Sequence, residues 1–169
     1  VSVADSKELA GCNLRITDGA GKEVISWTSG NRDSVKVSVT PEDGYQNLKY
    51  SFDENGNLHV GGLFHDKEYT LTETKPANGY VTAEAITYML KQKVAEDGTV
   101  TSVVNIKQKD GTYLEQEDDK TVMKDGQTHI QLLKLDKKTG QALGGAKFIV
   151  MDSKGNEVME FVTKDDAYD

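Results

Sequence analysis

Hydrophobic and polar residues alternate with a period of two along most of this chain, and long helical periodicity is absent. The alternation is cleanest in residues 35–39, 48–52 and 69–72. Later segments have similar patterns or are rich in β-branched residues, and Asp-Gly and Asn-Gly turn signals separate the segments. Many short strands with a turn about every 8–12 residues are typical of an antiparallel sandwich or barrel. The pattern therefore predicts an all-β fold.

An internal repeat divides the chain. Residues 7–16 align with residues 141–150, so that Leu9 matches Leu143 at an offset of 134 residues, and the alignment continues without a gap until Trp27 meets Phe161. We therefore expect residues 1–126 to form one complete β-sandwich. Residues 127–169 are expected to form a linker and the truncated start of a second repeat, which makes the sequence a piece of a longer tandem array.

The first unit is predicted to carry two inserted hairpins. One lies in residues 29–58, where we expect residues 35–39 to pair with residues 48–52. The other lies in residues 91–120, where residues 100–105 and 112–114 are the predicted strands. Insertions on a rigid scaffold are where a specific binding function would be sought.

Charge and composition exclude several classes of protein. The 169 residues carry a formal net charge of −8, which argues against binding to a phosphate backbone as the main activity. No apolar stretch approaches the roughly 18 residues of a membrane-spanning helix. The first residues lack the layout of a secretory signal, so any targeting segment is expected outside this sequence.

Candidate metal and cofactor residues are few. Cys12 is the single cysteine, and we expect it to be a buried small residue rather than a reactive thiol. The three histidines, His59, His65 and His129, show no ligand spacing, and we expect them to be solvated. Residues 53–57 resemble a calcium loop only faintly and are predicted to form a hairpin turn. No cofactor or metal is expected.

A motif around Glu73 resembles a known family. Residues 69–80 read Tyr-Thr-Leu-Thr-Glu-Thr-Lys-Pro-Ala-Asn-Gly-Tyr, similar to the box of collagen-adhesin B-type repeats and of SpaA-type pilin domains from Gram-positive cell surfaces. The opening motif of such a repeat runs from Lys134 to Ala146, and residues 121–136 look like a junction between two repeats. The resemblance implies a prealbumin-like, inverse immunoglobulin-like sandwich.

The resemblance also implies a self-formed cross-link, in which a lysine of the first strand bonds to an Asp or Asn of the last strand. Carried over by motif, Glu73 is the proton shuttle, Asp125 is the acceptor of the first unit and Lys134 is the nucleophile of the second unit. Burial favours this chemistry because it lowers the pKa of an amine and raises that of a carboxyl group. Asn105 is the alternative acceptor.

The first unit departs from the family pattern because its first-strand lysine is missing. The repeat places the counterpart of Lys134 immediately before Val1, and Lys7 lies too far along the chain to replace it. A sequence that begins one residue late is one explanation. A lysine from another chain and a different use of Lys134 are the alternatives.

The expected function is that of a structural stalk or pilin-like module of a Gram-positive surface protein. We expect the protein to have no enzymatic activity other than the formation of its own isopeptide bond. Neighbouring repeats of the same polypeptide are the expected partners, and localisation is expected to be extracellular and cell-wall anchored. The alternative is an adhesin that binds a host extracellular-matrix protein or glycan through its inserted hairpins.

Overall fold

The computed structural model describes residues 1–2, 4–5, 7–116, 120–130 and 132–164. The chain divides into two compact units, Val1–Gln127 and Thr128–Asp169. Across the described residues the structure is nearly all β, with eleven strands and a single 3₁₀ turn, η1 (Pro41–Asp43). The all-β prediction is confirmed.

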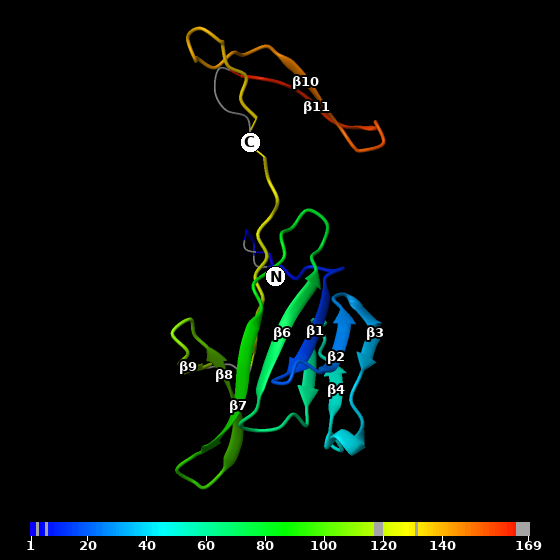
Figure 1. Ribbon diagram of the computed structural model, residues 1–169, viewed down its shortest axis with the longest axis vertical. Helices are drawn as coiled ribbons and strands as arrows, with labels where there is room; N and C mark the ends of the chain where they lie inside the picture. The colour runs from blue at the N-terminus through cyan, green and yellow to red at the C-terminus, as the bar shows by residue number, and fades with distance from the viewer. Residues whose placement is uncertain (3, 6, 117–119, 131, 165–169) are drawn as a thin grey trace. The chain divides into compact units, whose positions relative to one another are not determined.

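Unit 1 is built on one large antiparallel sheet (Figure 1). The sheet has the order β3-β2-β1-β6-β7-β8-β9, so the first three strands are joined to the last four through the pair β1–β6. Its strands are β1 (Asn13–Asp18), β2 (Glu23–Thr28), β3 (Asn31–Val37), β6 (Glu68–Lys75), β7 (Ile86–Val94), β8 (Val100–Lys107) and β9 (Tyr113–Glu115).

A separate hairpin, β4 (Lys49–Phe52) and β5 (Leu58–Gly61), packs on the core of unit 1. Leu58 and Val60 of this hairpin contact a buried cluster that contains Ile16, Leu71 and Val104 from three strands of the large sheet. The inward residues of those strands alternate with more exposed ones, as the period-two pattern requires. The core therefore lies between the large sheet and the hairpin.

The pairing inside the first predicted insertion was wrong. We expected residues 35–39 to pair with residues 48–52, but β3 pairs with β2 and β4 pairs with β5. β3 follows β2 across a tight turn at Ser29–Gly30, so local pairing extends the large sheet at little entropic cost. In the second insertion β8 and β9 pair only from Asn105 to Lys107, and residues 100–104, the rest of the first predicted strand, pair with β7 instead.

Unit 2 contains one hairpin, β10 (Lys147–Met151) and β11 (Glu157–Val162). Phe148 pairs with Phe161, and their rings stack with centroids 5.5 Å apart. In unit 1 Leu14 pairs with Trp27 at the corresponding place, and every pair of residues from Asn13 to Thr17 recurs 134 positions later, including the register shift near the turn. The two hairpins thus have the same backbone pairing, although their sequences differ.

Within the described residues, no helix has the length and apolar character needed to cross a membrane.

Candidate functional site

Glu73 is the third inward-facing residue of β6. Along this strand Tyr69, Leu71 and Glu73 are buried while the residues between them are more exposed. Strand geometry therefore sends a carboxyl group into the core from a position where the pattern would otherwise place an apolar residue. Only 4 % of Glu73 is exposed, and its Oε2 accepts a hydrogen bond of 2.7 Å from the backbone N–H of Ala83.

Asp125 reaches the same region from the far end of unit 1. It lies in an extended segment and forms a parallel β-bridge with Ser2. The Asp125 N–H donates to the Val1 carbonyl at 2.8 Å, and the Val1 amino group donates to the Met123 carbonyl at 2.7 Å. The structure thus pairs the Asp125 segment with the first residues of the chain.

The turn that follows β6 holds the Asp125 segment in place. Gly79 adopts a φ of +84°, which glycine tolerates without strain, and Tyr80 forms an antiparallel bridge with Gln127. The Val81 N–H also donates to the carbonyl of Gly126 at 2.9 Å. The Gly-Tyr end of the sequence motif therefore positions the acceptor segment, a role that the motif alone did not reveal.

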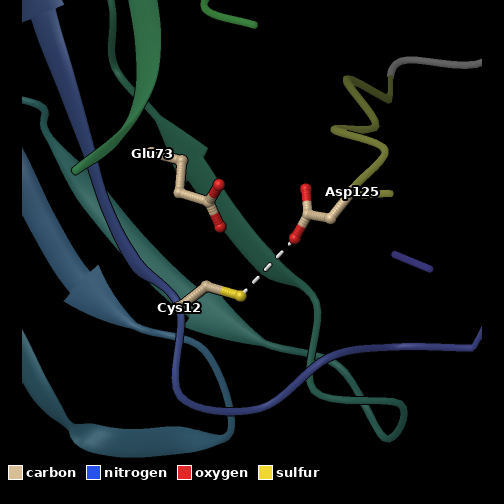
Figure 2. A group of neighbouring side chains, drawn as sticks. All are labelled: Cys12, Glu73 and Asp125. Carbon is tan, nitrogen blue, oxygen red and sulfur yellow. Dashed lines mark hydrogen bonds between the residues drawn. The ribbon is translucent and has the colours of Figure 1, made fainter. Parts of the chain in front are cut away.

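Cys12 is the third buried member of this cluster (Figure 2). Its Sγ lies 3.7 Å from Oδ2 of Asp125, and the thiol donates to that oxygen. Burial of Cys12 agrees with the sequence expectation, with 4 % of the residue exposed. Its contact with Asp125 was missed, because the two residues are 113 positions apart and only the fold brings them together.

The electrostatics of the cluster favour the protonated forms of Asp125 and Cys12. Burial, and then the negative charge of Glu73, raise the pKa of Asp125, while the Val1 amino group and the Cys12 hydrogen bond oppose the rise. Burial also raises the pKa of the Cys12 thiol, which is therefore neutral and able to donate. The two carboxyl groups and the thiol thus face one another, and each of the three residues is less than 5 % exposed.

A cavity of about 1210 Å³ opens beside the cluster. Glu73, Asp125 and Cys12 lie in its wall together with Val1, and much of the remaining lining is apolar, including Leu14, Leu71, Met123 and residues of the β4–β5 hairpin. The carboxyl groups therefore border a space that apolar side chains dominate.

The same three residues are a possible metal donor set. One ligand atom from each of Cys12, Glu73 and Asp125 lies within 4.8 Å of the others. Asp125 Oδ2 and Glu73 Oε2 already accept hydrogen bonds from the protein, so the carboxyl groups have partners without an ion. The expectation that the protein uses no metal or cofactor stays a prediction.

The remaining candidate residues lie outside the cluster. Asn105 follows the inward-facing Val104 on β8, so alternation directs it to the opposite face of the sheet, and it does not line the cavity. Lys7 is exposed and forms an ion pair with Asp5. Lys134 belongs to unit 2, where it is exposed and its carbonyl accepts the Leu143 N–H at 2.8 Å.

Asp53 and the histidines also take ordinary structural roles. Residues 53–57 form the predicted turn between β4 and β5, with the Asp53 carboxylate accepting from the Asn57 N–H at 2.9 Å. His59 lies 3.5 Å from Asp53, and His65 lies 3.2 Å from the Ser102 hydroxyl. All three histidines are exposed.

Comparison with protein families identifies the class of this fold. The family of SpaA prealbumin-like fold domains matches residues 1–110, which is most of the chain. The chain belongs to this family, as the resemblance predicted, and unit 1 is a SpaA-type pilin domain. No curated protein matches the sequence.

Solved structures with similarity to the chain include the shaft pilin spaA from Lactobacillus rhamnosus GG. The two share 19 % identity with a TM-score of 0.35, over 93 % of this chain and 54 % of the pilin. Two single-residue mutants of that pilin match at 20 % and 19 % identity, each with a TM-score of 0.35. The first match covers 90 % of this chain and 57 % of the mutant pilin. The second covers 93 % of this chain and 55 % of the mutant pilin. The chain thus spans about half the length of these pilins.

Proposed function

We propose that unit 1 is a structural module of a pilin-like surface protein, built to close an amide bond between Asp125 and a lysine immediately before Val1. Glu73 is the proton shuttle of this reaction. The observation that carries the proposal is the buried Glu73–Asp125 pair at the wall of an apolar cavity, next to the parallel bridge between Ser2 and Asp125.

The bridge supports the position of the lysine. Side chains alternate in an extended segment, so a residue immediately before Val1 shares its face with Ser2. Ser2 is 1 % exposed and pairs with Asp125, whose own side chain is buried. A lysine side chain at that position would therefore point inward, toward the acceptor.

Unit 2 supports the same register. The hydrogen bond from Ser2 N–H to the Lys7 carbonyl, 2.9 Å long, recurs between Asp136 and Gln141 at 2.9 Å, 134 positions later. Lys134 of unit 2 therefore corresponds to the position immediately before Val1 in unit 1. We propose that units 1 and 2 are tandem repeats and that Lys134 is the nucleophile of the second one.

The environment suits condensation of an acid with an amine. An apolar cavity favours the neutral, nucleophilic form of lysine, and the raised pKa of Asp125 favours its protonated form. The amine nitrogen adds to Cγ of Asp125, Glu73 takes a proton from the nitrogen and delivers it to the departing hydroxyl, and water leaves. An amide remains, and Glu73 returns to its starting state.

The mechanical role follows from where the bond would lie. It would join the start of unit 1 to its last residues and close a loop of about 125 residues. A cross-link that closes a loop of this length should stabilise the folded state by very roughly 4–5 kcal/mol, because it lowers the entropy of the unfolded chain. A stalk of such modules on the cell surface would hold its shape without disulfides. Neighbouring modules of the same polypeptide are the proposed partners.

Intact-mass measurement tests the proposal on a protein with lysine placed immediately before Val1. We expect this protein to weigh one water less than its sequence after folding. Asp125→Ala should retain the full mass, and Glu73→Gln should slow or block the loss of water while the fold persists. Glu84→Gln, which changes an exposed glutamate, is the matched control. Full mass in the parent protein after prolonged folding would contradict the proposal.

A further inference from the structure

The Cys12 thiol is a buried group in direct contact with the proposed acceptor, and the reaction above assigns it no role. Its Sγ lies 3.7 Å from Oδ2 of Asp125, and the S–H group, a weak donor, donates a hydrogen bond to that oxygen. Figure 2 shows the thiol and both carboxyl groups converging on one small volume. The thiol thus contacts an oxygen of the carboxyl group at which the lysine nitrogen would add.

The backbone does not need a thiol at this position. The Cys12 N–H donates to Ser29 Oγ at 2.9 Å, and the Ser29 N–H donates to the Cys12 carbonyl at 2.9 Å. In unit 2 the corresponding residues, Ala146 and Thr163, form the same two hydrogen bonds at 3.1 and 2.9 Å. Alanine therefore satisfies the local structure in unit 2, and the thiol of unit 1 supplies an additional donor.

We propose that Cys12 is a catalytic residue of the amide-forming reaction, in which its S–H group stabilises the negative charge that develops on Oδ2 of Asp125. This inference rests on the proposed function. When the lysine nitrogen adds to Cγ, the π electrons of the carbonyl bond move onto Oδ2, which the thiol already contacts. The carbonyl bond forms again when the other oxygen, protonated through Glu73, leaves as water.

A donor in this place acts as an oxyanion hole does. It contacts the oxygen before the reaction starts, and all three side chains of the cluster are almost fully buried, so its effect on the developing charge is larger than it would be in solution. The loss of one such donor commonly costs about 100–1000-fold in rate. A thiol is a weak donor, so we expect a loss of about 10-fold.

The rate of water loss in the protein with lysine immediately before Val1 tests the inference. Protein refolded from denaturant under reducing conditions is sampled over time by intact mass. Cys12→Ala should reach the same final mass about 10-fold more slowly. Cys12→Ser, which is similar in size but keeps a donor, should stay within about 3-fold of the parent. Equal rates for the parent and Cys12→Ala, or equally slow rates for the Ala and Ser variants, would overturn the role of Cys12.

A second measurement needs no lysine and uses the 169-residue chain itself. The Cys12 hydrogen bond lowers the pKa of Asp125, so Cys12→Ala should raise that pKa in a carbon-detected NMR titration. A purely packing role would leave it unchanged, and that result would also count against the inference. A parent protein that never loses water refutes the proposed function together with this inference, whereas a reactive parent with an equally fast Cys12→Ala variant refutes the inference alone.

Discussion

Ser2 and Asp125 pair in a parallel β-bridge that joins the first and last segments of unit 1. Both residues are almost fully buried, and Glu73 approaches Asp125 from the middle of the large sheet. A pulling force on a stalk acts on the two ends of each module. A covalent bond beside this bridge would carry that load directly, and the hydrogen bonds of the sheet would be spared.

The buried carboxyl group of Asp125 is expected to make the 169-residue chain less stable as pH rises. Its pKa is raised in the folded state above the ordinary value of 3.8, so between these two pKa values the folded protein retains a proton that the unfolded protein releases. Asp125→Asn removes this penalty. Thermal unfolding should give the variant a melting temperature a few degrees above that of the parent at pH 7, with the difference shrinking toward pH 4. A constant difference across this range would contradict the assignment.

The Glu73 charge is expected to add to burial in raising the pKa of Asp125. Glu73→Gln keeps an oxygen that can accept from the Ala83 N–H but removes the negative charge beside Asp125. The pKa of Asp125 should therefore fall, as measured by carbon-detected NMR titration. Glu84→Gln, at an exposed position, should leave it unchanged. No shift in the Glu73 variant would show that the two carboxyl groups do not interact.

Asp53 provides a pH response of the opposite sign. Hydrogen bonds from Asn57 lower its pKa to about 2, so the stability it contributes is present above its ordinary pKa and disappears as pH falls toward 2. Asp53→Ala should lower the melting temperature at pH 7, and the loss should shrink in acid. Glu54→Ala, in the same turn, should change the melting temperature little. A loss that stays the same at every pH would mean that the charge of Asp53 is unimportant.

Gly62 is expected to tolerate no side chain. Its φ is +82°, and a Cβ atom would lie 2.1 Å from the backbone oxygen of Asn47, which leads into β4. Gly62→Ala should therefore destabilise unit 1 by about 2 kcal/mol or more, measured by denaturant unfolding with Trp27 fluorescence. Gly61→Ala is the control, because nothing lies within 4 Å of a Cβ atom there. Similar stability of the two variants would refute the predicted clash.

The sequence by itself determined the β class and the equivalent pairing of two hairpins, and it predicted the two acids of the candidate site. Alternation placed Glu73 on the same face as Tyr69 and Leu71, because side chains of a strand point to opposite faces in turn. The offset of 134 residues predicted equivalent hairpins, and their pairing agrees residue by residue. These features depend on neighbouring residues along the chain or on a repeated pattern, and both can be recognised in the amino-acid sequence.

Only the tertiary structure decided which distant segments meet. Nothing in the pattern distinguishes β5 from β3 as the partner of β4, since all three strands alternate and pairing depends on the surrounding packing. The contact of Cys12 with Asp125 likewise requires the Tyr80–Gln127 bridge and the Ser2–Asp125 bridge to bring the last segment of unit 1 back to β1. The sequence predicts only a buried core residue at Cys12. Its thiol becomes part of the candidate site because the fold places Asp125 beside it.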